Sequence, residues 1–390
     1  MITVEKALTL LEQNIFRTER TVIIPLEKAL GHTLATAIVS PINMPPFRQS
    51  AMDGYAIASL QKEFSVIGEI KAGDIDMPSI KANEAVRIFT GAPVPDDARA
   101  VVMQEKTDVS DGLITLSEIP VAHANIRTVG EQIEQGEIAL EKGTYLNAAG
   151  IGFLATLGIT EVEVYQKPSI SIIATGNELI PPGNVLKFGQ IYESNSKALI
   201  AALQNFGFYD IEKTTVDDNF NTTIKVLETA IIQNDIVIIS GGISVGDYDF
   251  VGKALNELKV AEIFYKVKQK PGKPLFFGKK ENTLIFALPG NPAASLSCFY
   301  IYVLPALLKF SGHPAHHLPR TKARISSAYT KKGDRGQFLK AKVSNGTVTI
   351  LDGQASSMLR SFALANALAY IPEDRFEIAK NQEIEIIQIP

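Results

Sequence analysis

The sequence predicts a multidomain α/β plus β fold, in which a central α/β domain with a mostly parallel sheet lies between a β-rich N-terminal region and a small C-terminal β-barrel domain. The chain has 390 residues, more than one hydrophobic core usually supports. Apolar β-branched runs alternate with helical segments only in its middle part, and short strand-like runs separated by turn residues fill the rest. We therefore expect domains at residues 1–167, 168–312 and 318–390, the first of them discontinuous and made of two subdomains.

The first region is predicted to open with two helices and to continue as short strands. Val4, Ala7, Leu8 and Leu11 recur at amphipathic-helix spacing within MITVEKALTLLEQNIFR. The strand-like runs are FSVIGEI, AVRIF, AVVMQE and LITL, and proline-rich turns such as PINMPP and GAPVPDD separate them. A short helix over Asn147–Leu157 and the strand EVEVY then lead into the central region.

The central region alternates strands and helices. Its predicted strands are SISIIAT, DIVIIS, IFYKV and TLIFAL, and its predicted helices are SKALIAALQNF, TIKVLETAIIQ, FVGKALNEL and a long final helix. This alternation is typical of a parallel sheet with helices on both faces, and such sheets bind ligands at the carboxyl ends of their strands. The loops after Ala174, Ser240 and Leu288 are therefore expected along one edge of the sheet.

The last region contains short strand-like runs, among them FLKAKV, VTIL and IEIIQI, between Gly and Asn turns. We expect a small β-barrel or sandwich. From residue 318 to the end, 11 Lys and Arg stand against 7 Asp and Glu, so this region is basic in a chain of net charge −4. A basic end beside an acidic body suits an anionic ligand, although chance asymmetry on solvated surfaces explains it equally well.

Composition excludes several classes of protein. A net charge of −4 and a pI near 5.9 lack the strongly basic footprint of nucleic-acid or membrane-surface proteins. The single cysteine, Cys298, excludes an intrachain disulfide and fits a reducing compartment. The N-terminus has no signal-peptide pattern, and the uncharged stretch 292–308 is interrupted by polar residues and Pro305, so no transmembrane helix is predicted. We expect a cytoplasmic protein.

The loop SGGISVGDYD after the strand DIVIIS is predicted to hold a phosphorylated ligand. Gly241, Gly242 and Gly246 allow the backbone to approach an oxyanion closely, and the start of the next helix adds partial positive charge. Asp247 and Asp249 lie at that helix start, where helix capping is the simpler explanation for one acid taken alone.

Further acids follow the neighbouring strands. Glu178 follows the first strand, and Asp217 and Asp218 precede the next helix; each taken alone fits a turn or an N-cap. Together with the acids of the glycine loop they indicate Mg²⁺, because hard divalent cations bind carboxylate oxygens and bridge phosphates.

Positive charge is predicted in YKVKQKPGKP, which contains Lys266, Lys268, Lys270 and Lys273. If the strand continues through Lys270, the first three lysines share one face; a solvated edge strand is an equally good interpretation. The rigid turn LPGNP follows, and with the uncharged helix start after it is a second candidate anion cradle. Its residues are Pro289, Gly290, Asn291 and Pro292.

Three local patterns carry little weight alone. Asp53 and Thr90 lie in tight turns of the first region, where most such residues are only turn residues. Ser244 lies in G-x-S-x-G, the pattern of a serine hydrolase, but two aspartates within five residues argue against a nucleophile there. The histidines of HPAHH resemble a metal cluster, but Pro314 breaks helical spacing, so a surface linker is the better interpretation; they are His313, His316 and His317.

Eight motifs occur together in one order: SAMDGYA, FTGAPVP, VVMQE, TGNEL, GQIYESN, SGGISVGDYD, KPGKP and LPGNP. In this combination the chain closely resembles the MoeA family of molybdopterin molybdenumtransferases, whose eukaryotic relative is the gephyrin E domain. The resemblance covers nearly the whole chain. The α/β region resembles MogA-type molybdopterin-binding domains.

The resemblance implies a reaction and a set of partners. A molybdopterin molybdotransferase, or molybdenum insertase, inserts molybdate into the dithiolene of adenylylated molybdopterin with Mg²⁺ present, and it releases AMP and molybdenum cofactor. The family further implies a cytoplasmic homodimer whose active site lies between the α/β domain of one subunit and loops of its partner. A MogA-type adenylyltransferase and molybdoenzymes or their chaperones are the implied transient partners, with no nucleic acid and no membrane.

The resemblance also assigns residues by motif. The acids Asp53, Glu178, Asp218 and Asp249 match the family's acidic site, Asp53 coming from the other subunit, and the last three are the implied metal ligands. Lys266 and Lys270 match catalytic lysines that counter phosphate or molybdate charge. The implied ligand-binding residues are Thr90, Gly241, Gly242, Ser244, Gly246, Lys273, Pro289, Gly290, Asn291, Pro292, Arg335 and Ser356.

One position departs from the family pattern. The family has Gly-Glu-Asp-Ile where this chain has GEQI, so Gln132 replaces an acid, and we expect a reduced rate or an altered metal dependence. A non-catalytic pterin-binding scaffold is the alternative function, because the gephyrin relative also clusters receptors, but no sequence feature identifies a partner surface.

Overall fold

The computed structural model of the chain describes residues 1–243 and 250–390, and these residues form two compact units. The larger unit contains the central sheet, the first helix and the C-terminal barrel, and the smaller unit is rich in β-strands. Strands β1 (Thr21–Pro25) and β12 (Glu161–Tyr165) contribute residues to both. The larger unit comprises Met1–Val22, Gly31–Thr33 and Val164–Pro390, and the smaller unit comprises Ile23–Leu30 and Leu34–Glu163.

The smaller unit is built around a six-stranded sheet and includes the predicted helix α2 (Ala148–Thr156). The strands are β4 (Gly54–Ile57), β5 (Glu63–Ile70), β6 (Glu84–Ile88), β7 (Ala100–Met103), β8 (Thr107–Ser110) and β9 (Leu113–Leu116). They lie in the order β7-β4-β6-β5-β9-β8. Buried side chains alternate between two apolar clusters, with Tyr55 and Ile57 in one and Ala56 in the other.

The start of the chain contains one helix instead of the two predicted. Helix α1 (Val4–Asn14) begins after Thr3, whose hydroxyl accepts a hydrogen bond from the backbone N–H of Lys6. The second expected helix is replaced by β1 and the short 3-10 helix η1 (Leu26–Lys28). Four consecutive β-branched residues open β1, and these favour extended backbone over helix.

The larger unit contains a six-stranded sheet in the order β16-β13-β17-β21-β20-β18, in which the first four strands are parallel and β20 runs antiparallel to both of its neighbours, β21 and β18. Its strands are β13 (Ile170–Thr175), β16 (Ile211–Val216), β17 (Ile236–Ser240), β18 (Ala261–Tyr265), β20 (Phe276–Lys280) and β21 (Thr283–Leu288). The predicted α/β domain with a mostly parallel sheet is thereby confirmed.

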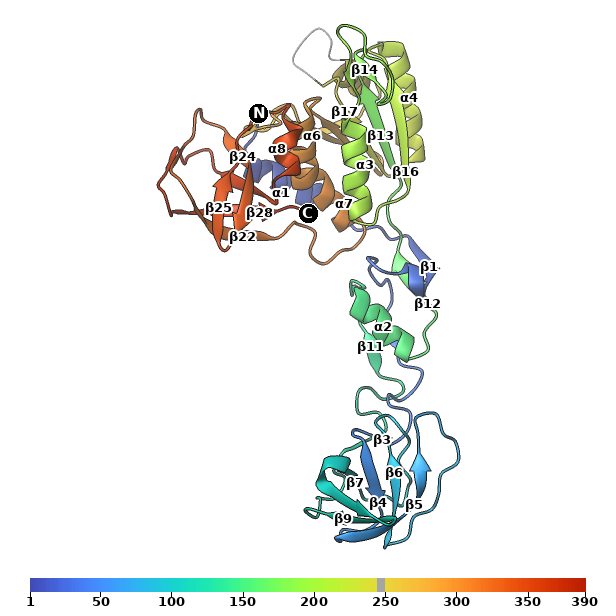
Figure 1. Cartoon of the computed structure of the whole chain (residues 1–390). Coiled ribbons are helices and arrows are strands. Elements are labelled where there is room, and N and C mark those ends of the chain that lie inside the picture. The colour runs from blue at the N-terminus through green and yellow to red at the C-terminus, as the bar shows by residue number, and fades with distance from the viewer. Residues whose placement is uncertain (244–249) are drawn as a thin grey trace. The chain divides into compact units, whose positions relative to one another are not determined.

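Helices cover both faces of this sheet (Figure 1). In β17, Ile236 and Ile238 join one apolar cluster with α1 and α3 (Asn195–Asn205), whereas Val237 and Ile239 join a second. The second cluster includes α4 (Phe220–Gln233) and α5 (Phe250–Glu257). The chain after β13 therefore leads to a helix on one face, and the chain after β17 to a helix on the other. Such a switch point opens a crevice at the carboxyl ends of the strands.

Two strands of the sheet were not recognisable as apolar runs. Strand β16 reads IEKTTV and lies at the sheet edge with Glu212 and Lys213 exposed, so it lacks the buried pattern of a central strand. Strand β20 forms an antiparallel hairpin with β21. The predicted strand IFYKV also ends early, because Lys266 adopts a left-handed backbone with φ of 64°.

The long final helix of the α/β region runs from Pro292 to Phe310. It consists of α6 (Pro292–Cys298), the π-helical segment η3 (Phe299–Val303) and α7 (Leu304–Phe310). By length and composition alone this helix could cross a membrane. However, 78% of its most apolar window is buried inside the protein, as in a helix of a hydrophobic core.

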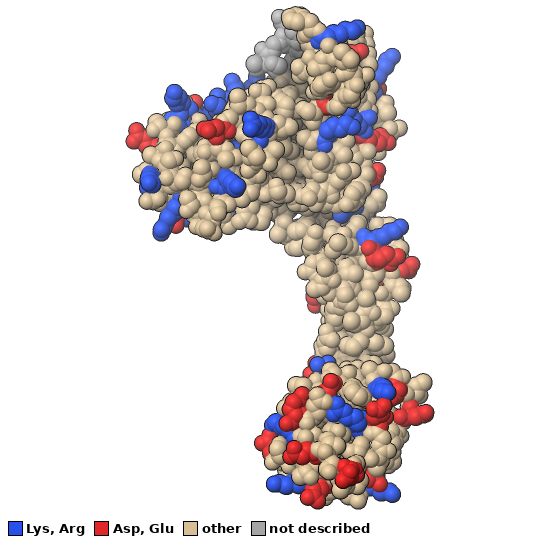
Figure 2. Space-filling view, in the orientation of Figure 1, with Lys and Arg blue, Asp and Glu red and all other residues tan. Residues whose placement is uncertain are grey.

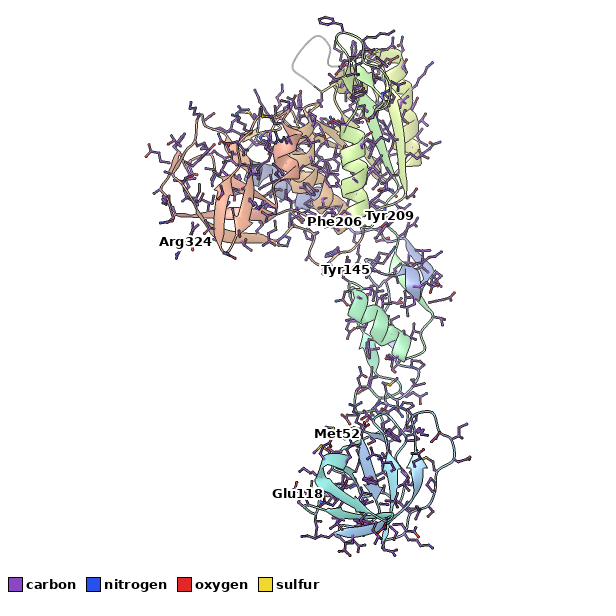
Figure 3. All side chains as sticks on the ribbon, viewed as in Figure 1. Met52, Glu118, Tyr145, Phe206, Tyr209 and Arg324 are labelled. Atoms are coloured by element: carbon purple, nitrogen blue, oxygen red, sulfur yellow. The ribbon has the colours of Figure 1, made fainter. Side chains whose placement is uncertain are left out.

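The C-terminal region is a closed five-stranded barrel, which confirms one of the two predicted forms. Its strands are β22 (Arg320–Ile325), β24 (Gly336–Ser344), β25 (Thr347–Ile350), β26 (Ala367–Ile371) and β28 (Glu383–Gln388). They follow the order β24-β25-β22-β28-β26, and pairing of β26 with β24 closes the ring. Arg324 points outward between the buried Ala323 and Ile325 (Figure 3). Basic side chains lie over the barrel surface visible in Figure 2.

Candidate active site at the carboxyl edge of the sheet

A pocket of about 660 Å³ lies at the carboxyl edge of the parallel strands, and we call it the carboxyl-edge pocket. Its walls come from the loops after β13, β16, β17 and β21 and from the start of α3. This is the edge where the crevice between β13 and β17 opens. The predicted site residues among its lining residues are Glu178, Asp218, Gly241, Gly242, Pro289, Gly290, Asn291 and Pro292.

Glycine is required at two pocket residues that lie next to Thr175, the last residue of β13. Gly241 and Gly242 have φ of 93° and 63°, in the left-handed region that glycine tolerates best. A Cβ on Gly241 would lie 2.7 Å from the carbonyl oxygen of Thr175, and a Cβ on Gly242 would lie 2.6 Å from the Thr175 hydroxyl oxygen. Close packing against Thr175 thus explains glycine at these two positions, and the approach of this backbone to a phosphorylated ligand stays a prediction.

Of the three acidic residues that line the pocket, Glu178 and Asp218 come from neighbouring loops. Glu178 is exposed and folds back over Gly176, and Asp218 is half-buried. The side chain of Asn177 connects the two loops, because its Oδ1 accepts a hydrogen bond from the backbone N–H of Asp218 at 2.9 Å. Two carboxylates beside an open cavity are a donor set that fits Mg²⁺, which binds one or two protein carboxylates and completes its shell with water and phosphate oxygens.

Two buried polar atoms in the pocket wall have no hydrogen-bond partner among the described residues. They are the hydroxyl oxygen of Thr175 and the Oδ1 of Asn195. The Nδ2 of Asn195 donates to the Ser240 hydroxyl oxygen and to the Gly290 carbonyl oxygen, both at 2.8 Å, so its orientation is fixed. An unpaired buried acceptor costs free energy unless a ligand or water satisfies it. The residues that carry these two atoms line the cavity.

Sequence reasoning missed Thr175, Glu193 and Asn195 as pocket residues, although the last two lie in the motif GQIYESN. Glu193 is 3% exposed, and its carboxylate accepts from the backbone N–H and hydroxyl of Ser196 and from Lys213. Burial raises the pKa of Glu193, but these hydrogen bonds outweigh burial and the pKa is lowered. Glu193 therefore stays charged and fixes the start of α3 at the pocket.

The predicted anion cradle at LPGNP is partly occupied by the protein itself. The backbone N–H groups of Ala293 and Ala294, in the first turn of α6, donate to the carbonyl oxygen of Ser356 at 3.0 and 3.2 Å. Ser356 is thus placed at the helix start, and its neighbour Ser357 lines the pocket. The role of this turn in anion binding stays a prediction, with fewer free N–H groups than the sequence suggested.

The strand does not continue through Lys270, so the condition for the first three lysines to share one face is not met. The left-handed turn at Lys266 separates β18 from β19 (Gln269–Lys270), a two-residue strand that pairs with β24 of the barrel. Lys268 forms an ion pair with Asp334 at 3.0 Å, and Arg335 donates to the Gln269 carbonyl oxygen at 3.4 Å. The ligand contacts predicted for Lys266, Lys270, Lys273 and Arg335 stay predictions.

The predicted residues of the first region lie in the smaller unit. Asp53 has an exposed carboxylate whose Oδ1 accepts from the backbone N–H and the hydroxyl of Thr90, at 2.8 and 2.9 Å. These two hydrogen bonds are the main cause of the lowered pKa of Asp53. Gln132 lines a small pocket with Gln49, Arg127 and other residues of the same unit. The predicted residues Ser244, Gly246, Asp247 and Asp249 lie outside the described residues.

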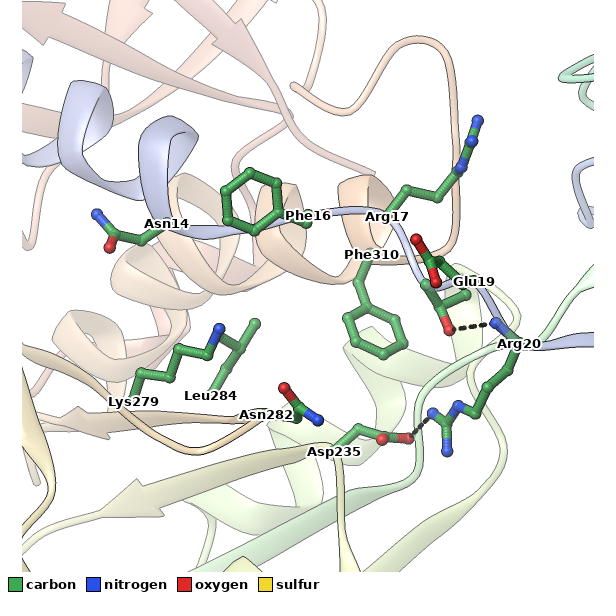
Figure 4. Close-up of a pocket in the computed structure, with 11 residues that line it drawn as sticks. Asn14, Phe16, Arg17, Glu19, Arg20, Asp235, Lys279, Asn282, Leu284 and Phe310 are labelled. Carbon is green, nitrogen blue, oxygen red and sulfur yellow. Dashed lines mark hydrogen bonds and ion pairs between the residues drawn. The ribbon is translucent and has the colours of Figure 1, made fainter.

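A second pocket, of about 430 Å³, lies at the opposite, amino edge of the sheet, and we call it the amino-edge pocket (Figure 4). Asp235, just before β17, accepts hydrogen bonds there from the Arg20 guanidinium at 2.6 Å and from the backbone N–H and hydroxyl of Ser169. The Arg17 guanidinium lies 4.4 Å from the centre of the Tyr165 ring. Asp235, Arg20 and Arg17 therefore have partners within the protein.

Three family models match consecutive parts of the chain. The MoeA N-terminal region (domain I and II) matches residues 2–158, a probable molybdopterin binding domain matches residues 171–309, and the MoeA C-terminal region (domain IV) matches residues 322–389. The chain belongs to the MoeA family. Together the three matches account for both compact units and for the barrel.

Individual members of the MoeA family agree with this assignment. A molybdopterin molybdenumtransferase of Haemophilus influenzae is 36% identical, over 99% of this chain and 98% of that protein. Molybdopterin molybdenumtransferase 2 of Mycobacterium tuberculosis is 33% identical, over 94% of this chain and 95% of that protein. The crystal structure of a molybdopterin biosynthesis MoeA protein from Pyrococcus horikoshii superimposes with a TM-score of 0.84 over the whole of both chains, at 30% identity.

These comparisons confirm the family that the eight motifs predict. They also confirm the class of enzyme, a molybdotransferase of molybdenum cofactor biosynthesis. The carboxyl-edge pocket lies within the part matched by the molybdopterin binding domain model, apart from Ser357.

Proposed function

We propose that this MoeA-family enzyme inserts molybdate into adenylylated molybdopterin with Mg²⁺, and that AMP is released as the phosphoanhydride is cleaved. The observation that carries this proposal is the carboxyl-edge pocket, which brings together the carboxylates of Glu178 and Asp218, the glycine backbone at Gly241 and Gly242, and the LPGNP turn. A pyrophosphate can bind to the glycine backbone and to a metal ion held by the carboxylates, and a polar heterocycle can hydrogen-bond to the polar side chains.

Glu178 and Asp218 are the described residues that would hold Mg²⁺, with Asp249 added by its motif. When bound, the ion supplies positive charge that neutralises the phosphate oxygens and stabilises the leaving phosphate. The chain's own groups provide orientation. The backbone at Gly241 and Gly242 admits the pyrophosphate closely, and Asn195 offers its Oδ1 to N–H groups of the substrate.

The lysines supply the compensating charge in this proposal. Lys266, Lys270 and Lys273 occupy the segment next to Pro274, which lines the pocket. Electrostatic stabilisation by fixed charges, without a covalent nucleophile, then accounts for catalysis. Substrate phosphates near these ammonium groups are stabilised most when water is excluded from the cavity.

We further propose a cytoplasmic homodimer in which Asp53 reaches the pocket of the other subunit. Its carboxylate is exposed and held in one orientation by the two hydrogen bonds from Thr90, as a residue that acts on a partner's substrate requires. A MogA-type adenylyltransferase is the proposed donor of the substrate, and molybdoenzymes or their chaperones are the proposed acceptors of the product.

The deciding experiment incubates the full chain with adenylylated molybdopterin, molybdate and Mg²⁺ and measures AMP. We expect molybdate-dependent AMP release that Glu178→Gln reduces about 100-fold. The control is Glu212→Gln, an exposed acid of β16 outside the pocket, which should leave the rate unchanged. Folded protein that releases no AMP would support the non-catalytic scaffold, and labelling of Ser244 by a fluorophosphonate would support the hydrolase.

Gln132 provides a separate test of the acidic set. An amide keeps the shape of the family's aspartate but loses its charge, so we expect Gln132→Asp to raise the rate or to change its Mg²⁺ dependence. If turnover and the Mg²⁺ response are both unchanged in Gln132→Asp, this position does not contribute to metal or proton handling.

A further inference from the structure

Three potential metal ligands converge outside the carboxyl-edge pocket, where α1 meets the segment between α7 and β22. The Nε2 atoms of His316 and His317 lie 2.7 and 3.0 Å from the same oxygen, Oε1 of Glu12. The ligand atoms of the three residues all lie within 4.8 Å of one another. Glu12 precedes the histidines by about three hundred residues, so the fold alone brings this group together.

The chemistry of the group is that of a transition-metal site. Two imidazoles and one carboxylate are a common donor set for Zn²⁺, and the remaining coordination position is filled by water or substrate. All three side chains are partly exposed, at 26%, 36% and 34% for His316, His317 and Glu12, so an ion can reach them.

We propose that Glu12, His316 and His317 form a Zn²⁺ site that joins the first helix to the segment leading into the barrel. Neither the molybdotransferase activity nor the proposed substrates involve this site. The sequence favours a surface linker over a metal cluster here, because Pro314 breaks helical spacing. That argument holds for the histidines alone, but it does not foresee that α1 supplies the third ligand.

Hydrogen bonding is the competing explanation for the same geometry. Two imidazole N–H groups that donate to one carboxylate oxygen would show the observed distances without any metal. A tetrahedral Zn²⁺ places neighbouring ligand atoms about 3.3 Å apart, so the Nε2 atoms of His316 and His317 would have to move away from Oε1 of Glu12 by about 0.6 and 0.3 Å. The two explanations predict different effects of replacing a histidine by glutamine. A glutamine amide can donate the hydrogen bond, but it is a poor ligand for Zn²⁺.

Lys309 sets a limit on the affinity. Its ammonium lies 2.6 Å from Oε2 of Glu12 and 2.6 Å from the Glu12 carbonyl oxygen, so it occupies one carboxylate oxygen and leaves Oε1 to the histidines. A positive charge this close opposes a divalent cation. We therefore expect a micromolar rather than a tighter dissociation constant, with one Zn²⁺ per chain.

The test uses the full chain without a histidine tag and measures Zn²⁺ binding by calorimetry in millimolar Mg²⁺, which suppresses Zn²⁺ at carboxylate-only sites. His316→Gln, His317→Gln and Glu12→Gln should each weaken binding at least tenfold. The matched control is His123→Asn, an exposed histidine of the smaller unit, which should bind Zn²⁺ like the wild type. Equal Zn²⁺ binding by the control and the three variants would overturn the proposal.

Two further measurements remove the remaining ambiguity. Thermal unfolding without metal should be nearly unchanged in His317→Gln, because the amide can keep the hydrogen bond to Glu12, whereas the rise in unfolding temperature produced by Zn²⁺ should disappear. Crystals soaked in Zn²⁺ should show an anomalous peak about 2.0–2.1 Å from both Nε2 atoms. A peak elsewhere, or a Zn²⁺-induced stabilisation that survives in His317→Gln, would show that the group is only hydrogen-bonded.

Discussion

The pockets at the two edges of the central sheet differ in whether their polar groups have hydrogen-bond partners within the protein. At the amino edge, the carboxylate of Asp235 accepts hydrogen bonds from Arg20 and Ser169, so it has partners within the protein. At the carboxyl edge, Thr175 and Asn195 keep buried oxygens without partners among the described residues, and the carboxylate of Glu178 is exposed. Polar groups that are hydrogen-bonded within the protein contribute to stability, whereas polar groups without such partners are available to bind a ligand.

The largest effect is expected at the carboxyl edge, on activity. Asp218→Asn should lower the rate of AMP release about 100-fold, because the pocket wall loses a carboxylate that we propose holds Mg²⁺ at the reacting phosphates. The free energy of unfolding should change by less than about 0.5 kcal/mol, since Asn177 binds the backbone of residue 218 and not its side chain. Rates at saturating substrate and urea unfolding measure the two quantities.

Asp217→Asn is the matched control for this prediction. Asp217 is exposed, lies in the same loop and does not line the pocket. If Asp217→Asn slows the reaction as much as Asp218→Asn, the loop acts through its net charge and the pocket geometry is irrelevant.

The opposite pattern is expected at the amino edge. Asp235→Ala leaves the backbone N–H of Ser169 and the Arg20 guanidinium without their acceptor, and we expect a loss of about 2 kcal/mol in the free energy of unfolding. Activity per folded molecule should not change. Arg20→Ala should cost only about 0.5–1 kcal/mol, because the Arg20 side chain is 50% exposed and surface ion pairs contribute little. A large loss of activity in folded Asp235→Ala would contradict the contrast between the two edges.

The sequence could predict which edge binds ligands because the evidence for it is local. Buried strands such as DIVIIS have a recognisable apolar pattern, and the glycine loop follows directly. The rule that parallel sheets bind ligands at their carboxyl ends then brings Glu178, Asp218 and Pro289 to one rim, as the structure shows.

The rest of the site depends on tertiary contacts that no local pattern carries. Asn195 is one of many asparagines near a helix start, and only its contacts with Ser240 and Gly290 place it in the pocket wall. The strand considered through Lys270 is interrupted because Lys266 adopts a left-handed backbone, which its residue type does not predict. The polar strand β16 forms because β13 pairs with it, although its own sequence lacks a buried pattern.

A smaller effect is expected from the unpaired acceptor itself. Asn195→Ala removes the Oδ1 that we assign to a substrate N–H, so kcat/KM should fall about tenfold, as for the loss of one hydrogen bond with its buried partner. Asn205→Ala, at the exposed other end of α3, should leave kcat/KM unchanged. An unaltered kcat/KM in Asn195→Ala would mean that water, not substrate, satisfies this atom.

The smallest effect concerns an unpaired atom outside both pockets. The Nδ1 of His32 is buried without a partner among the described residues, and burial, aided by the positive charge of Lys167, lowers the pKa of His32 from 6.5 to about 4. Above pH 6.5 the ring is neutral in both the folded and the unfolded chain. As the pH falls from 6.5 towards 4, only the unfolded chain gains the proton, so stability decreases.

Solvent screens part of this effect because the ring is only half-buried, and we expect the wild type to lose about 1 kcal/mol over this range through His32. Urea unfolding at pH 7.5 and pH 4.5 should show that His32→Gln removes this part of the pH dependence and that His123→Asn, at an exposed position, does not. Activity should not follow the same profile, because His32 does not line the carboxyl-edge pocket. If His32→Gln instead changed KM for the pterin substrate, an unpaired buried polar atom outside both pockets would also affect substrate binding.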